Sequence, residues 1–238
     1  MGEDFSPHFK GKRFVVAKET ETETEGTKKG KKNLAAAEEQ ADIFVNKHYA
    51  ITVSGEAPLI FNRMPMLNVP KSRAKNQAKI DPVENEWQTW KEKLHFREDL
   101  GVYIPADNWR ESLKGAAKYW GMRRPGEGMK TYTELITVAV VCEELALGIM
   151  SKEDPRIIPY ETMVNGNPTS GKGGGKVFKI RPMVMPPWGG TFRIHVYDGR
   201  LHQEVLLTIL QFAGMLGHCD RRPHFGRFKV VGMEEVEL

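Results

Sequence analysis

Apolar and polar residues alternate along residues 49–55, where Tyr49, Ile51 and Val53 are separated by smaller or polar residues. This period of two is typical of a strand with one buried face. Apolar and β-branched segments predict further strands at residues 100–104, 131–141, 156–160, 177–185, 191–197 and 225–231. The strands at residues 177–185 and 191–197 are expected to pair across the turn at residues 186–190.

Three other segments have apolar residues three or four positions apart, which predicts amphipathic helices. They lie at residues 83–94, at residues 202–215, and between Pro105 or Ala106 and Trp120. In the last of these a proline at the start and Gly121 after the end are typical helix boundaries. The order strand, helix, strands, helix, strand matches the split βαβ arrangement. We therefore expect an α+β fold with a ferredoxin-like core, the plan that RNA-recognition domains also use.

The N-terminal part of the chain has a different composition. Residues 17–42 contain alternating Glu and Thr and then a lysine cluster, with almost no bulky apolar side chains. Such a segment buries too little surface to offset the entropy cost of ordering it. We expect residues 1–42 to be a flexible extension and residues 43–238 to form the core, with insertions at about 64–98 and 151–193.

Composition excludes several classes of protein. The chain of 238 residues suits one substantial domain. It has no apolar run long enough for a membrane span, and its first residues lack the apolar centre of a secretory signal. Two cysteines are too few for a disulfide framework or a four-cysteine zinc site. We expect a cytoplasmic protein with no membrane, cofactor or metal partner.

Charge is distributed unevenly, although the net charge is only +4. Residues 63–79 contain five basic residues and no acidic one, and residues 163–200 contain six basic residues and one acidic one. Acidic residues gather instead at residues 81–92, 143–154 and the C-terminus. This division indicates a basic face for a polyanion and a separate acidic surface, although ordinary solvated charge is the alternative.

The most specific segment is GMLGHCDRRPHFGRFKV at residues 214–230. Its glycines allow the backbone to approach a ligand, and Arg221, Arg222 and Arg227 can make forked contacts to phosphate. His224 and Phe225 can stack on bases or pack beneath the loop. The alternative is a helix C-cap followed by a turn with exposed arginines.

Two other loops are basic. Residues 166–172 spell GNPTSGK, the phosphate-loop pattern, but Gly173 stands where a Ser or Thr would hold magnesium. A flexible hairpin tip that touches a polymer fits this segment better. Trp188 lies in the PPWGG turn near Arg181 and Arg193, so it is the tryptophan that we expect to stack on bases. The full set of expected contacts is Arg63, Lys71, Arg73, Lys75, Lys114, Lys172, Lys176, Arg181, Trp188, Arg193, Arg221, Arg222, His224, Phe225 and Arg227.

Catalytic motifs are absent from the sequence. Neither HExxH nor GxSxG occurs, and His218 beside Cys219 lacks further nearby metal ligands. His218 or His224 near the arginines could act as a general base in RNA cleavage.

The final segment LLTILQFAGMLGHCDRRPHFGRFKV resembles the helix, glycine/arginine loop and strand of the RAMP superfamily, the RNA-binding proteins of CRISPR systems. ITVSGEAPLIFNR is similar to the opening strand of its backbone subunits, and GVYIPADNWRESLKGAAKYWG to their strand-to-helix entry. The resemblance covers about residues 46–232. It implies a palm-like core with inserted finger and thumb loops, and subunits that polymerise along an RNA strand. The loop at residues 217–226 would then lie on the RNA-binding palm.

We therefore expect a protein that binds single-stranded RNA or DNA without catalysis and assembles as repeated subunits, as a homo-oligomer or within a ribonucleoprotein. Divergent relatives from phages or mobile elements would fit the small size. Two alternatives are an endoribonuclease of the guide-RNA-processing type, and a self-assembling protein that mimics a CRISPR subunit.

Overall fold

The computed structural model describes residues 44–63, 81–165, 176–218 and 222–237. Outside these ranges lie the expected N-terminal extension and the phosphate-loop-like segment. Of the expected contact residues, Lys71, Arg73, Lys75, Lys172 and Arg221 also lie outside the described ranges.

A four-stranded antiparallel sheet and two helices form the core. In chain order these elements are β1 (Phe44–Gly55), α3 (Ala106–Trp120), β5 (Val140–Cys142), β9 (Gly189–Asp198), α5 (Gln203–Leu216) and β10 (Phe228–Val236). The strand order is β10-β1-β9-β5, and each neighbouring pair is antiparallel. Counting only these six elements, the fourth strand lies beside the first and the third lies between the first and second. This is the ferredoxin-like arrangement, so the predicted α+β, ferredoxin-like fold is confirmed.

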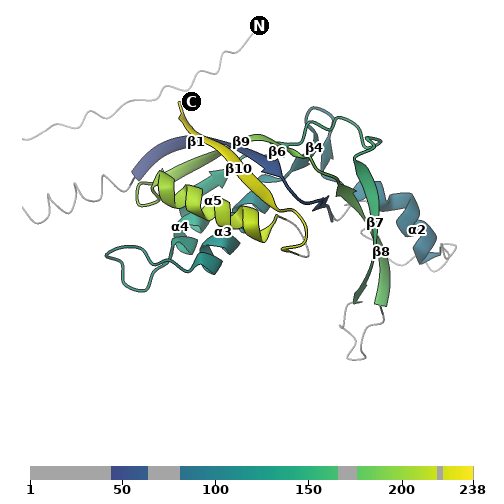
Figure 1. The fold of residues 1–238 in the computed structure, drawn as a ribbon, viewed down its shortest axis with the longest axis horizontal. Helices are drawn as coiled ribbons and strands as arrows, with labels where there is room; N and C mark the ends of the chain where they lie inside the picture. The colour runs from purple at the N-terminus through teal and green to yellow at the C-terminus, as the bar shows by residue number, and fades with distance from the viewer. Residues whose placement is uncertain (1–43, 64–80, 166–175, 219–221, 238) are drawn as a thin grey trace, which may run out of the picture. The chain divides into compact units, whose positions relative to one another are not determined.

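The helices cover one face of this sheet (Figure 1). The alternating residues Tyr49, Ile51 and Val53 of β1 are all buried. Trp109 of α3 stacks on Phe192 of β9 with ring centroids 4.2 Å apart, and it meets Phe228 of β10 edge-on at 5.3 Å. The apolar residues that alternate along the strands therefore pack against the apolar residues spaced three or four apart on each helix.

Further elements lie between the core elements. Between β1 and α3 the chain forms β2 (Leu59–Ile60), α2 (Pro82–Thr89), a 3₁₀ helix η2 (Trp90–Lys93), β3 (Phe96–Arg97) and β4 (Gly101–Ile104). Between α3 and β9 it forms α4 (Tyr132–Ala139), β5 of the core sheet, β6 (Leu145–Ala146), β7 (Ile157–Asn165) and β8 (Lys176–Val184). These strands make two small sheets, β2-β8-β7 and β3-β4-β6. In Figure 1, β7 and β8 form a long hairpin with α2 beside it.

The predicted strand at residues 131–141 is wrong for most of its length. Tyr132–Ala139 is the helix α4, and only Val140–Cys142 is a strand. Tyr132, Leu135, Ile136 and Ala139 are the buried residues of α4, and their spacing is helical. The burial of this stripe outweighs the β-preference of Thr133, Thr137 and Val138.

The predicted pairing of residues 177–185 with residues 191–197 is also wrong. β8 pairs with β7 and β2, whereas β9 pairs with β1 and β5. The turn between them therefore joins two different sheets. The reason lies in burial, because Phe192, Ile194 and Val196 of β9 must face the helices of the core.

None of the helices in the described ranges is long and apolar enough to cross a membrane.

Candidate nucleic-acid interface

Helix α5 ends at Leu216 and β10 begins at Phe228. Between them the structure describes residues 217–218 and 222–227, and we call this connection the 217–227 loop. Gly217 has φ +84°, and a Cβ at this position would lie 2.3 Å from the carbonyl oxygen of Phe225. The N–H of His218 donates to the carbonyl of Gly226 at 2.9 Å, which closes the base of the loop. Glycine is therefore required at residue 217, where the two ends of the loop touch.

The 217–227 loop is also fixed to the chain just after β1. The N–H of Gly226 donates to the Pro58 carbonyl at 2.8 Å, and the N–H groups of Glu56 and Ala57 donate to the Arg227 carbonyl. These bonds hold the backbone on both sides of Arg222 and at Arg227 itself. The resulting geometry presents side chains from a rigid base, as a binding loop requires.

Trp188 is a structural residue, which corrects the prediction that it stacks on bases. It is only 3% exposed, and its indole N–H donates to the Ala57 carbonyl at 2.7 Å. Its ring occupies the space beside Gly55, where any Cβ would collide with it. The indole therefore packs under the segment that anchors the loop, and a base cannot reach its faces.

Three arginines around the loop remain available for a ligand. Arg63, Arg222 and Arg227 are exposed, and within the described part of the chain none of them makes an ion pair. The Arg222 guanidinium lies along α3, since a Cβ on Gly115 would be 3.6 Å from it. An arginine without a carboxylate partner has all its donors free for phosphate oxygens.

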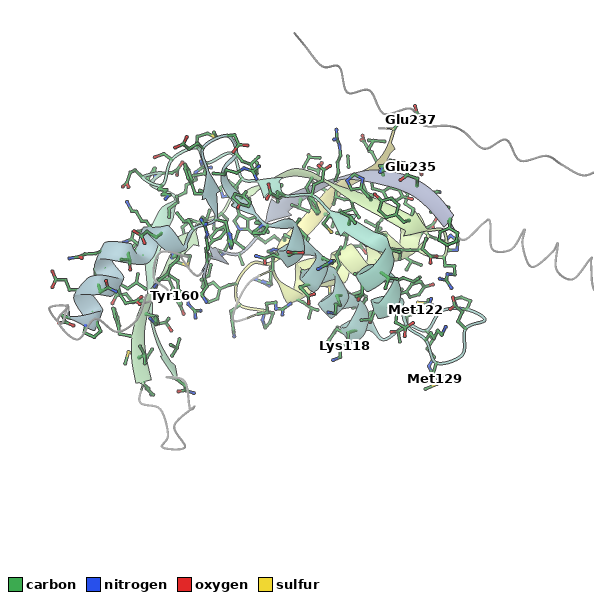
Figure 2. The ribbon with its side chains drawn as sticks, turned by 180° about the vertical axis from the view of Figure 1, so that it is seen from behind. Lys118, Met122, Met129, Tyr160, Glu235 and Glu237 are labelled. Carbon is green, nitrogen blue, oxygen red and sulfur yellow. The ribbon has the colours of Figure 1, made fainter. Side chains whose placement is uncertain are left out.

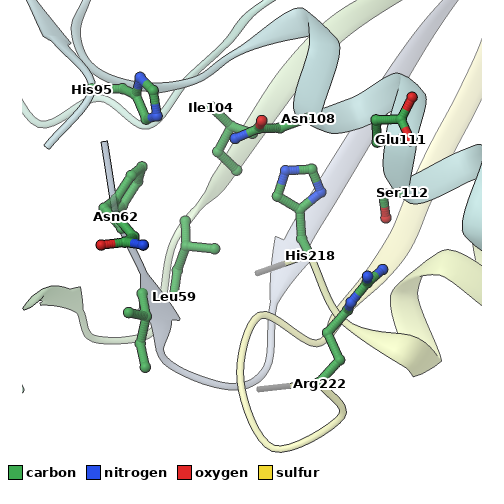
Figure 3. A pocket seen from close by; sticks show the side chains of 11 residues that line it. Leu59, Asn62, His95, Ile104, Asn108, Glu111, Ser112, His218 and Arg222 are labelled. Carbon is green, nitrogen blue, oxygen red and sulfur yellow. The ribbon is translucent and has the colours of Figure 1, made fainter. Parts of the chain in front are cut away.

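A pocket of about 400 Å³ opens beside Arg222 (Figure 3). Its wall combines Leu59 of β2, His95, the first turns of α3 with Asn108 and Ser112, and His218 of the loop. These residues come from four separate parts of the chain. We call this cavity the loop pocket.

His218 is the most unusual side chain of the loop pocket. It is 8% exposed, and in the described part of the chain neither ring nitrogen has a hydrogen-bond partner. Its ring lies against Trp109 with centroids 4.3 Å apart. Burial, and then the charge of Arg222, lower the pKa of His218 to about 3. The imidazole is therefore neutral at pH 7.

The rim of the loop pocket carries charge of both signs. Glu111 lines the pocket and forms an ion pair with Lys114 at 3.3 Å. Burial, and then the charge of Arg63, lower the pKa of His95. The fold thus brings Arg63, Lys114 and Arg222 of the expected set to one site.

An aromatic pair joins the β7–β8 hairpin to the same loop. Phe225 is half-buried, and its ring meets Tyr160 of β7 at 5.2 Å (Tyr160 is labelled in Figure 2). Phe225 therefore packs beneath the loop, one of its two predicted roles, while His224 is exposed. Of the expected hairpin residues, Lys176 is exposed at the end of β8 and Arg181 is half-buried.

Arg193 does not belong to this site. It follows Phe192 on β9, so it points away from the helices, and it lies 4.0 Å from Glu143. The acidic residues Glu235 and Glu237 (Figure 2) lie at the far end of β10 from the loop. Nine residues of strand separate the two ends of β10 by about 30 Å. The end of β10 next to the loop is therefore the basic one.

Sequence reasoning missed the loop pocket and its neutral polar residues Asn62, Asn108 and Ser112. Nothing in the local sequence distinguishes them from ordinary surface residues. Across the described ranges there is also no group of three or more side chains suited to hold a metal ion.

No protein-family model and no curated protein matches this chain. Among solved structures it is similar to a chain in the cryo-EM structure of the Type III-B Cmr-beta bound to cognate target RNA. The identity is 12%, the TM-score is 0.43, and the match covers 89% of this chain and 68% of that chain.

Proposed function

We infer that this protein binds single-stranded nucleic acid through the 217–227 loop and its surroundings. The observation that carries this inference is the set of exposed arginines, Arg63, Arg222 and Arg227, without an ion-pair partner in the described ranges. Two of them lie on a loop fixed by backbone hydrogen bonds. Phosphate contacts from such residues supply most of the affinity for a polyanion.

The dependence of affinity on salt concentration measures how many phosphates the protein contacts. Each phosphate neutralised on a single strand changes the slope of log affinity against log salt by about 0.7. Fluorescence anisotropy with a labelled single strand, as RNA and as DNA, should show an affinity that falls steeply as salt rises. Absence of salt-sensitive binding to both strands would refute the proposal.

Arginine variants test whether the loop makes the phosphate contacts. Arg222→Ala and Arg227→Ala should each lower the slope by about 0.7. Arg123→Ala is a matched control, because Arg123 is also exposed but lies in the connection after α3. An equal effect of all three substitutions would show that binding is diffuse and that the loop has no special role.

Assembly of several copies along one strand belongs to the same proposal. It is supported by β10, a nine-residue strand at the edge of the core sheet as formed by the described residues, since strand edges are able to pair with other chains. Mass measurement with strands of increasing length should show complexes that grow by whole subunits. A single copy per strand at every length would contradict assembly but leave strand binding intact.

A further inference from the structure

We propose that the loop pocket takes up one unpaired base of the bound strand, while Arg222 holds a neighbouring phosphate at the pocket mouth. This inference rests on the proposed function and names the part of the ligand that the pocket recognises.

The first argument is the volume of the cavity and the apolar residues in its lining. Its volume of about 400 Å³ lies within the range of about 300–1,000 Å³ that small-ligand sites occupy. Leu59, Ile60 and Ile104 contribute apolar side chains to its lining. A base has apolar faces and polar edges, so it needs an apolar surface together with a few polar groups.

The second argument is that several polar groups of the pocket, apart from Glu111 and Arg222, are neutral. The hydroxyl of Ser112 and both nitrogens of His218 are buried and have no partner in the described ranges. Asn62 and Asn108 add two amides. Hydroxyl, amide and neutral imidazole groups match the donors and acceptors on the edge of a base.

The third argument is the position of the charges. Glu111 lines the pocket and would repel an anion inside it, whereas Arg222 lines it from the loop. In Figure 3 the side chain of His218 points toward α3, where Asn108 lies, and Arg222 approaches from the loop side. A phosphate is therefore better placed against Arg222, and the interior suits a neutral group.

Among the described residues, the imidazole of His218 has an aromatic contact but no hydrogen-bond partner. Trp109 lies between Phe192 and His218, with centroid distances of 4.2 and 4.3 Å. Rotation about the Cβ–Cγ bond of His218 exchanges a ring carbon with a ring nitrogen at the pocket wall. A base in the pocket can thus receive the hydrogen bond that the protein itself does not supply.

Such a pocket predicts a preference for single strands over duplexes. A base in a duplex is stacked and paired, and extruding it costs a few kcal/mol, whereas an unpaired base is free to enter. Base-pairing the strand should therefore block the pocket and leave only the backbone contacts.

The test compares a strand with and without its bases. The full chain is titrated with a fluorescent single strand of mixed sequence, made as RNA and as DNA, and with abasic strands of the same backbone. The intact strand should bind about tenfold more tightly than the abasic one. Asn108→Ala should weaken binding of the intact strand only, whereas Arg222→Ala should weaken both. Asn85→Ala is the matched control, an exposed asparagine near the start of α2.

Each outcome decides the matter. Equal affinity for intact and abasic strands would overturn the base pocket and leave the proposed function standing. A preference for intact strands that Asn108→Ala, Ser112→Ala and His218→Phe all leave unchanged would place the base contacts elsewhere and also overturn it. No binding of either strand would refute both proposals together.

Discussion

Two polar side chains, Glu86 and His218, are both buried, but they differ in whether hydrogen bonds compensate for the loss of water. They are 6% and 8% exposed. The Glu86 carboxylate accepts hydrogen bonds from Lys93, from Lys179 at 2.7 Å and from the N–H of Ile180 at 2.9 Å. The imidazole of His218 has no hydrogen-bond partner in the described ranges.

The pKa values of the two groups reflect this difference. Burial alone would raise the pKa of Glu86, but the hydrogen bonds from Lys179, Lys93 and Ile180 outweigh it and lower the pKa. For His218 burial acts without compensation and lowers the pKa to about 3, with a further contribution from Arg222. Glu86 stays charged because its carboxylate accepts these hydrogen bonds. The same bonds join α2 and η2 to the hairpin. His218 stays neutral and keeps its hydrogen-bonding capacity for something else.

The comparison predicts, first, a large loss of stability when Glu86 is changed. Glu86→Gln leaves Lys93 buried without its countercharge, so the free energy of unfolding should fall by about 3 kcal/mol. Denaturant titration measures this. Glu84→Gln on the exposed side of the same helix is the control and should change stability by less than about 0.5 kcal/mol. A loss below about 1 kcal/mol for Glu86→Gln would mean that the ion pair contributes little.

The second prediction concerns the stability of the protein at acidic pH. The folded-state pKa of His218 is depressed, so at pH values between about 6.5 and about 3 the unfolded chain binds a proton that the folded chain does not. Stability is therefore lost as pH falls through this window. Between pH 6 and 4 the native protein should lose about 2 kcal/mol more than His218→Phe does. Identical pH profiles for the two proteins would show that His218 is protonated in the folded state.

The third prediction is the effect of His218→Phe at pH 7.5. An apolar ring removes two unsatisfied polar atoms and keeps the contact with Trp109. Stability should stay equal or rise by about 1 kcal/mol, in contrast to Glu86→Gln. Thermal unfolding checks it, and a loss of more than about 2 kcal/mol would identify His218 as a structural residue like Glu86.

The smallest effect is expected for Ser112→Ala. Its hydroxyl also lacks a partner in the described ranges, so the free energy of unfolding should change by less than about 0.5 kcal/mol. If the hydroxyl binds a base, affinity for an intact strand should fall about fivefold, the equivalent of one hydrogen bond of about 1 kcal/mol. Anisotropy titration of the variant against the native protein makes the measurement.

The sequence by itself predicted the elements whose patterns are local. The helical stripe of α3, the alternation of β1, and the order of strands and helices led to the ferredoxin-like core. Arg222 and Arg227 were also recognised as loop residues able to contact phosphate, because glycine and arginine near a strand start are visible in any short window. These inferences depend on neighbours a few residues apart, which a chain carries in its sequence.

Only the tertiary structure decided which elements pack together and which buried polar side chains have hydrogen-bond partners. Residues 131–141 became mostly helix, and β8 and β9 separated into different sheets, because burial against distant elements outweighed local preference. Trp188 proved to be a support for residues 55–57, although a tryptophan in a PPWGG turn has the same sequence whether it is exposed or buried. The loop pocket joins Leu59, His95, Asn108 and His218, which lie far apart along the chain. A missing hydrogen-bond partner is a property of all the surrounding residues, so it becomes visible only when they are assembled.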